Sequence, residues 1–481
     1  MAETTVIRNA AWVAAWNEGE GAHEYLRDAD VAFRGDTIVH VGPGFSAPAD
    51  ARVVDGARRF VMPGLLDLHA HPHTEPANKG IREDHGRPEM YDTGLYERAC
   101  AFSLDEEGRR AAAELAYAEL LAGGVTTVMD LSTPCDGWLD LLAGSGLRGY
   151  VAPAFASARW YLDNLHDVKF AWDEKRGEAE FARAIEVIER AEQHPSGRLA
   201  GVVYPAQIDT CTEALLRDAA ALARESGRVL TTHASQSKME FLEMVRRHGV
   251  SPLQWAHDIG FLGPNAVVGH AIFIDEHPMI GWRSHRDLAL LADTCTSVAH
   301  CPSPFARYGH AMADFGRYRR AGVNLGIGTD VAPHSVIEEM RLAIILGRVM
   351  AEDVRALDTG EVFRAATVGA AKALGRDDLG RIAPGAKADL VLVDLDAPSM
   401  RPVRDPLRTL VYEAADRAVR DVYVGGELVV AERRVLNLDP EGAGERLERA
   451  QARMLEAVPR RDFLHRTAEQ IAPLSLPRRQ R

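Results

Sequence analysis

Two histidines, His69 and His71, close an apolar run that begins at Val61 and contains the turn pair Pro63-Gly64. Such a run is typical of a buried β-strand. Side chains two residues apart on a strand point to the same side, so both imidazoles face one way. Two imidazoles at one strand end can bind one metal ion. Alone, this spacing is a weak signal, because surface and core histidines also produce it.

Three later runs of strand length also end in a residue that can bind a metal: Arg228–His233, Ala266–His270 and Val323–Asp330. A (β/α)8 barrel gathers the C-terminal ends of its strands at one face, where the active sites of this fold lie. Five donors that are scattered along the chain can therefore meet at one ion. The sequence thus predicts a barrel with a metal site at its C-terminal face.

The middle of the chain alternates helical and strand-like segments, which predicts a parallel sheet. The Ala-rich stretch Glu106–Ala122 precedes a β-rich run from Gly124 to Asp130, and Glu213–Ser226 precedes the run that ends at His233. We expect an α/β protein in which residues 63–383 form a catalytic, TIM-like (β/α)8 barrel.

The two ends of the chain carry short β-rich runs instead. Residues 1–62 alternate such runs with turns, and strand signals return at Ala388–Asp394 and Asp421–Val430. We expect 1–62 and 384–435 to form one small β-sandwich domain beside the barrel. Residues 436–481 are predicted to form a charged helix, from Asp439 to about residue 460, followed by a tail rich in proline and arginine.

Composition limits the partners and the compartment. The 481-residue chain has a formal net charge of −14, which argues against nucleic acid and anionic membranes. It has no apolar run long enough to cross a bilayer and no signal peptide at its first residues. Five cysteines, an odd number without a Cys-x-x-Cys pair, fit reduced thiols. We expect a cytoplasmic homo-oligomer (dimer or tetramer) that acts on a small molecule.

Five motifs span most of the chain: Pro63-Gly-Leu-Leu-Asp-Leu-His-Ala-His71, Thr232-His-Ala-Ser235, Gly269-His-Ala271, Gly328-Thr-Asp330 and Gly385-Ala-Lys-Ala-Asp-Leu390. In type and order they resemble the metal-dependent amidohydrolase superfamily, in the branch of cytosine deaminase and the triazine hydrolases. Any single strand-end histidine is as readily a core residue satisfied by the backbone. The whole set in family order is hard to explain that way.

The resemblance implies that His69, His71, His233 and Asp330 bind a divalent metal. Zinc is the expected ion, with iron, cobalt, manganese and nickel as alternatives. Binuclear members bridge two metals with a modified lysine on strand four. The segment that we assign to that strand, residues 201–207, has no lysine. We therefore expect one ion per subunit.

The expected chemistry is hydrolysis by an activated water. A metal in such a site lowers the pKa of its water from about 15.7 to roughly 7. Asp330 would take the water's proton as general base and then deliver it to a leaving nitrogen as general acid. His270, implied to lie beside this water or the substrate, would donate to the developing oxyanion.

Gln236 departs from the family pattern. Cytosine deaminase-like enzymes carry His-x-x-Glu, whose glutamate passes protons to a ring nitrogen, but this chain has His233-Ala-Ser-Gln236. An amide cannot transfer a proton, so Gln236 is expected to bind substrate. Four further residues are candidates to line the substrate site, although His300 could equally support the site from behind and Tyr204 could be core: His300, Tyr204, Gln207 and His334.

A long segment of weak periodicity, from Pro72 to about Asp105, follows the first ligand strand. Loops of this length at such a place often form lids or substrate walls. Four residues in it lie within reach of the site, although each alone is typical of a surface: His73, Glu75, Asn78 and His85.

The sequence therefore predicts a mononuclear metal hydrolase of C–N bonds in amides, ureas or carbamates. The segments around His233, His300 and Asp330 look like those of phenylurea and thiocarbamate hydrolases. The alternative is an aminohydrolase, a deaminase or dechlorinase, that acts on an N-heterocycle such as a triazine or nucleobase. A non-catalytic scaffold with this fold is a third possibility, which the complete donor set argues against.

Overall fold

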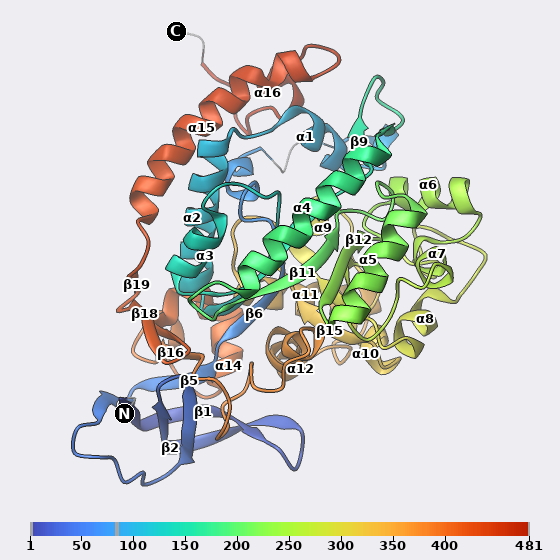
Figure 1. Cartoon of the computed structure of the whole chain (residues 1–481). Coiled ribbons are helices and arrows are strands. Elements are labelled where there is room, and N and C mark those ends of the chain that lie inside the picture. Colours follow the sequence, from blue (N-terminus) through green and yellow to red (C-terminus); the bar gives the residue numbers. More distant parts are fainter. Residues whose placement is uncertain (1–2, 82–85, 480–481) are drawn as a thin grey trace.

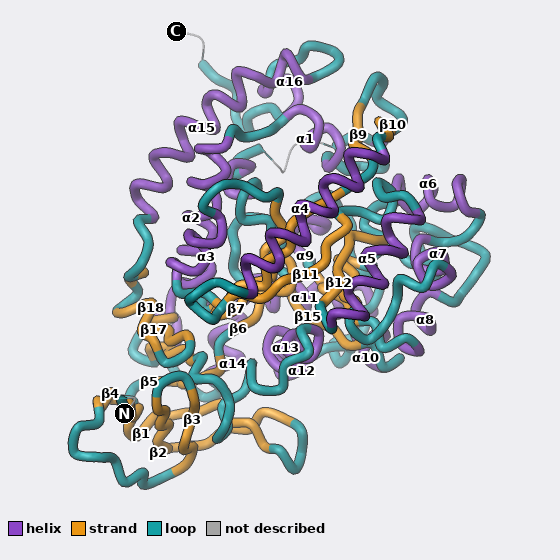
Figure 2. Tube along the Cα trace, in the orientation of Figure 1, coloured by secondary structure: helices purple, strands orange, loops and turns teal. Residues whose placement is uncertain are grey.

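An eight-stranded sheet lies at the centre of the computed structural model, which describes residues 3–81 and 86–479 (Figures 1 and 2). Each strand pairs in parallel with the next along the chain. A parallel bridge between Ala70 and Asp330 joins the first strand to the segment after the last one. The strands are β6 (Leu65–Ala70), β7 (Val125–Ser132), β8 (Arg148–Phe155), β11 (Leu199–Pro205), β12 (Val229–Ala234), β13 (Ala266–His270), β14 (Ser297–His300) and β15 (Asn324–Ile327). The predicted TIM-like barrel is confirmed.

These strands are short and almost entirely buried. Every residue of β6, β7, β12, β13 and β14 is buried, as expected when helices and barrel interior cover both faces of a parallel sheet. Most functional side chains therefore project only from the ends of the strands.

Helices surround the sheet. The predicted helices appear as α2 (Glu106–Ala122) and α5 (Glu213–Ser226), whose N-termini are capped by the side chains of Asp105 and Thr212. The other barrel helices are α3 (Trp138–Ser145), α4 (Glu174–Glu192), α6 (Lys238–His248), α7 (Pro252–Asp258), α8 (Asp287–Asp293), α9 (Pro302–Ala306), α10 (Phe315–Arg320), α11 (Val336–Ala351), α12 (Thr359–Arg364) and α13 (Ala370–Ala373).

The two ends of the chain meet in a second sheet beside the barrel, at the bottom of Figure 1. Strand β5 pairs with β1 on one side and with β16 on the other, which confirms that both termini build this β unit. Its strands are β1 (Thr4–Asn17), β2 (Ala22–Arg34), β3 (Thr37–Gly42), β4 (Arg52–Asp55), β5 (Arg59–Pro63), β16 (Leu390–Asp394), β17 (Val419–Val424), β18 (Glu427–Ala431) and β19 (Arg434–Val435). Only Gly64 separates β5 from β6, so the second sheet leads directly into the first ligand strand.

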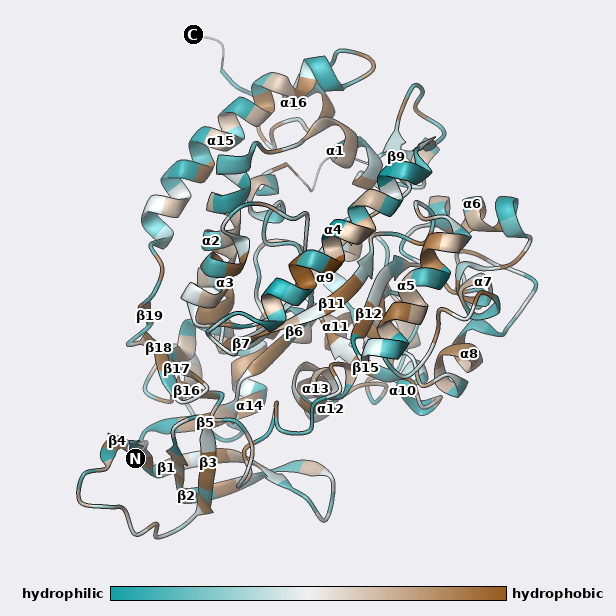
Figure 3. Ribbon diagram, in the orientation of Figure 1, coloured by the Kyte–Doolittle hydropathy of each residue, from teal (hydrophilic) through white to brown (hydrophobic). Residues whose placement is uncertain are grey.

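The predicted C-terminal helix is α15 (Pro440–Arg461), capped by Asp439 and followed by α16 (Ala468–Ile471). It runs along α2, and in Figure 3 it is mostly hydrophilic in colour. One face is buried, because five residues at helical spacing point inward: Ala443, Leu447, Ala450, Met454 and Val458.

The segment after β6 is more ordered than its sequence pattern suggests. Its described part contains the short 3-10 turns η1 (Glu75–Asn78) and η2 (Pro88–Met90) and helix α1 (Leu95–Ala101). A small hairpin, β9 (Ala158–Tyr161) with β10 (Lys169–Trp172), lies close to α1. Within residues 3–81 and 86–479, none of the helices is both long and apolar enough to span a bilayer.

Candidate metal centre and active site

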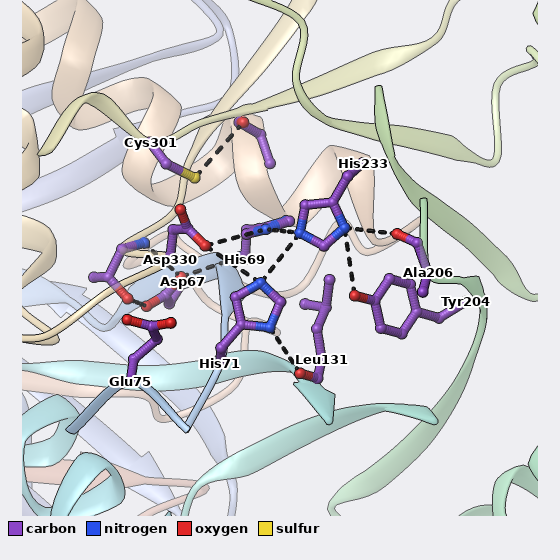
Figure 4. Close-up of polar contacts among 12 residues, drawn as sticks. Asp67, His69, His71, Glu75, Leu131, Tyr204, Ala206, His233, Cys301 and Asp330 are labelled. Carbon is purple, nitrogen blue, oxygen red and sulfur yellow. Dashed lines mark hydrogen bonds and ion pairs between the residues drawn. The ribbon is translucent and has the colours of Figure 1, made fainter. Parts of the chain in front are cut away.

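Four side chains of the types that bind metals converge at the C-terminal face of the barrel (Figure 4). His69, His71, His233 and Asp330 each offer one ligand atom, and these atoms lie within 4.8 Å of one another. The Nε2 atom of His233 lies 3.0 Å from that of His69 and 3.1 Å from that of His71. The carboxylate of Asp330 lies 3.3 Å from His71 Nε2 and 3.7 Å from His69 Nε2.

Hydrogen bonds made by the Nδ1 atoms of His233 and His71 orient these two rings so that their Nε2 atoms face each other. The Nδ1–H of His233 donates to the carbonyl of Ala206 at 2.7 Å, and the Nδ1–H of His71 donates to the carbonyl of Leu131 at 2.9 Å. Each neutral ring carries one proton, so both Nε2 atoms are left as acceptors. Acceptors this close repel each other unless a cation lies between them.

The donor set therefore fits a divalent metal. Tetrahedral zinc with ligands at about 2.0–2.1 Å holds its donor atoms about 3.4 Å apart, close to the spacings found here. Two glycines leave room for His69. A Cβ at Gly269 would lie 2.7 Å from the imidazole ring of His69, and a Cβ at Gly328 would lie 2.6 Å from the Cβ atom of His69. The strand-end motifs thus place glycine where the first ligand needs space.

The pKa shifts of three of the four side chains agree with this assignment. Burial, followed by the neighbouring imidazoles, lowers the pKa values of His69 and His233 well below the usual range. Burial would raise the pKa of Asp330, but hydrogen bonding to His71 and the nearby imidazoles hold it well below its usual value. Neutral imidazoles and an ionised carboxylate are the forms that bind metals. His71 differs: burial acts to lower its pKa, but the hydrogen bond to Asp330 and the charge of that carboxylate raise it overall, so a metal would take the place of the proton shared by these two side chains.

His270 stands beside this group rather than in it. Its ring centroid lies 4.7 Å from that of His69 and 4.7 Å from that of Phe305. Burial lowers the pKa of His270 to about 4, so the ring is neutral near pH 7. A neutral imidazole that lines the cavity next to the ligands is suited to donate one hydrogen bond to a substrate oxygen or nitrogen.

The backbone is unusual at three of the ligand strand ends. Ser235, His270, Ala271 and Asp330 all have positive φ, at 55°, 78°, 44° and 59°. Residues other than glycine rarely adopt a positive φ, and those that do cluster at functional sites. The strands break regular geometry where they present their polar ends.

A cavity of about 190 Å³ opens beside the ligands. His71, His233, His270 and Asp330 form its floor. Its walls come mainly from the segment after β6 and from the loops after β8, β11, β12 and β14: Thr74, Glu75, Thr93, Leu95, Arg98, Ala99, Trp160, Gln207, Gln236, Ser237, Pro304, Phe305, Tyr308 and His310. A larger cavity of about 490 Å³ lies elsewhere, between the β1–β2 hairpin and α12, without any of the candidate ligands.

The predicted substrate residues divide into two groups. Gln236 and Gln207 line the cavity. Tyr204, His300 and His334 are absent from its lining. The Tyr204 hydroxyl lies 3.4 Å from His233 Nδ1, behind the ring, His300 packs against Phe315, and His334 Nδ1 lies 2.8 Å from Thr329 Oγ1.

The sequence pattern did not predict how deeply the residues after His71 are buried. Glu75, Asn78 and His73 are all buried, whereas His85 lies outside the described residues. The Arg98 Nη1 donates to Glu75 Oε1 at 2.6 Å, and both residues line the cavity. Weak periodicity hid this pair, since neither η1 nor α1 is long enough to show a helical pattern.

Asp67 is a second functional residue that the sequence did not predict, although it lies within the Pro63–His71 motif. It is fully buried, and its carboxylate accepts hydrogen bonds from the backbone N–H of His69 and of Thr329, both at 3.0 Å. The Thr329 hydroxyl donates to the same carboxylate at 2.6 Å. Asp67 therefore ties the end of β6 to the segment that carries Asp330.

The fold and this site define a metal-dependent hydrolase built on a TIM-like barrel. The model of the amidohydrolase family matches residues 60–429. The chain belongs to this family and is a hydrolase that acts on carbon–nitrogen bonds.

Proteins similar to this chain include deaminases and a triazine hydrolase. The chain is 31% identical over 428 residues to the 5-methylthioadenosine/S-adenosylhomocysteine deaminase of Halobacterium salinarum, which covers 87% of this chain and 92% of that protein. An adenosine deaminase structure from Xanthomonas campestris with bound zinc has a TM-score of 0.80 and 26% identity, covering 94% of this chain and 98% of that one. The zinc complex of atrazine chlorohydrolase from Arthrobacter aurescens shares the fold, with a TM-score of 0.77, 23% identity and coverage of 95% and 100%.

Proposed function

We propose that the protein is an aminohydrolase that removes an amino group from an N-heterocycle, with one divalent metal bound by His69, His71, His233 and Asp330. The observation that carries the proposal is the cavity, whose floor includes three of these four donors and whose walls include the flat rings of Trp160 and Phe305. Aromatic walls suit a planar ring. The deaminases among its relatives support the same reaction class. A cytoplasmic homo-oligomer stays a prediction.

The residues divide the work as follows. His69, His71, His233 and Asp330 would hold a divalent ion, which when bound would polarise water and lower its pKa to about 7. Asp330 accepts the proton of the attacking water and passes it to the departing amine. His270 donates a hydrogen bond where negative charge develops. Gln236 orients the ring by hydrogen bonding but supplies no proton.

A second candidate is hydrolysis of amides, ureas or carbamates, including phenylureas and thiocarbamates. Gln236 is the observation that favours it, because a leaving amide nitrogen needs only the proton that Asp330 carries. A heteroaromatic ring also needs a proton on its own nitrogen, at the position where the family's glutamate acts.

One panel assay separates the two. Purified, zinc-loaded protein is offered aminated purines, pyrimidines and triazines, and in parallel amides, phenylureas and carbamates. We expect ammonia release from the first set, and equal or faster release by Gln236→Glu. Hydrolysis of the second set alone would favour the second candidate. Elemental analysis should give one metal per chain, and two would refute the mononuclear site.

A further inference from the structure

The C-terminal segment, residues 436–479, contacts the wall of the cavity from outside, although the family match ends at residue 429. Helices α15 and α16 pack against α2 and the segment after His71 (Figure 1). They share one apolar cluster with it: Ala77, Ile81, Ala101, Phe102, Leu104, Ala111, Ala112, Leu447, Ala450, Met454, Val458 and Ile471. The segment is therefore integral to this side of the barrel.

The first polar contact reaches η1. The Gln451 side-chain N–H donates to the carbonyl of Ala77 at 2.7 Å. This turn begins at Glu75, whose own N–H donates to the carbonyl of the ligand His71 at 3.1 Å. One hydrogen bond from α15 thus holds the turn that carries a cavity carboxylate.

The second contact reaches α1. Arg466, just before α16, lies 3.0 Å from the carboxylate of Glu97. Glu97 is only 2% exposed, so the ion pair lies in a poorly solvated place, where it is stronger than at a surface. The next residue, Arg98, lines the cavity and pairs with Glu75.

We infer that the C-terminal segment is a positioning element for the substrate. The two contacts just described end on Ala77 and Glu97, close in sequence to Glu75 and Arg98. They therefore help to fix these two charged residues of the cavity wall relative to each other. A loosened wall must be ordered again each time a substrate binds, which weakens binding. The inference rests on the proposed function only in taking this cavity as the substrate site.

The test is the double variant Gln451→Leu/Arg466→Gln with both single variants. We expect KM to rise about 5- to 30-fold in the double variant, which corresponds to a loss of about 1–2 kcal/mol of binding free energy. We expect kcat and zinc content to stay unchanged. Arg466→Lys keeps the charge but loses the forked pair of donors, so its KM should lie between those of the wild-type protein and Arg466→Gln. Arg453→Gln is the matched control, because Arg453 lies on the same helix and pairs with Asp105 and Glu107 instead.

Hydrogen exchange followed by mass spectrometry gives a readout that needs no substrate. Backbone amides of residues 72–80 and 95–101 should exchange faster in the double variant, and those of β12 should not. Unchanged exchange and KM would overturn the inference, as would a loss of zinc that accounts for all lost activity. Should no heterocycle be deaminated, faster local exchange would still support the positioning role, while the proposed function would fail. If the double variant does not fold, the single variants decide by the same criteria.

Discussion

The ligand group and the Asp389 network both bury a carboxylate, but they surround it with different partners. Asp389 is 3% exposed and lies 3.2 Å from Arg148, a residue of the barrel strand β8. It also accepts the backbone N–H of Gly425 at 2.6 Å. In the ligand group, by contrast, the Nε2 atom of His233 lies 3.0 and 3.1 Å from two other imidazole nitrogens, while the Nδ1–H of the same ring donates to Ala206. The first arrangement is complete within the protein, whereas the second is completed by a cation shared among the rings.

This contrast teaches how to separate structural from functional buried charge. Native proteins pair nearly all buried polar groups. Asp389 follows that rule and ties the terminal sheet to the barrel. The crowded acceptors violate it, and the violation marks the place where a ligand completes the structure. The four predictions below would break or sharpen this comparison.

The largest effect is expected for His69→Ala. Without this imidazole the group loses one of its four donors, so zinc content and turnover should both fall to near zero while the chain stays folded. Elemental analysis and circular dichroism would check this. Full activity with zinc retained would show that the crowding around His233 is not a metal site.

Asp330→Asn should lower turnover by about 10²–10⁴-fold, the range for a general acid–base residue. The amide still fills the space but cannot accept the water's proton. Zinc content and kcat are measured together. Near-normal kcat at normal zinc content would remove the proton-transfer role.

His270→Ala should lower kcat by about 10²–10³-fold, as for the loss of one hydrogen-bond donor to developing charge. Zinc content should be unaffected, since His270 is outside the four-residue group. If zinc is lost, and added zinc restores the full rate, His270 is instead a ligand.

Asp389→Asn should leave kcat per folded, zinc-loaded molecule unchanged but reduce the free energy of unfolding by about 3–5 kcal/mol, because it leaves Arg148 buried without a counter-charge. Asp396→Asn is the control. Its carboxylate pairs with Arg58 at the surface, where such pairs contribute about 0–1 kcal/mol. A loss of kcat in folded, zinc-loaded Asp389→Asn would contradict the conclusion that Asp389 is only structural.

Much of this fold was readable from the sequence. Helices α2 and α5 end where the pattern predicts, because alanine-rich runs, capping residues and Gly227 all agree. The four donors were found because each follows a strand-length apolar run. These signals are local, so one sequence contains them.

The cavity wall was not readable in the same way. Glu75 and Arg98 come from a segment whose order depends on packing against α2 and α15, and no local period reveals such contacts. His300 ends β14 and His334 lies in the loop between β15 and α11, but both hydrogen-bond or pack away from the cavity. Only three-dimensional packing separates them from Gln236. The preference for amides over ring deamination rested on Gln236 and on the likeness of three segments to phenylurea and thiocarbamate hydrolases. That likeness is not confirmed, and the deaminase relatives favour the alternative.

The pairing of β5 with β16 has a consequence for how the chain is made. Met62 of β5 is opposite Val391 of β16. Strand β5, from the start of the chain, therefore pairs with a strand that is synthesised only after the whole barrel. Until then β5 presents an unpaired edge, which is a site for intermolecular pairing. Chains that stall or are cut before residue 390 should therefore aggregate through their N-terminal strands, however well their barrel helices form.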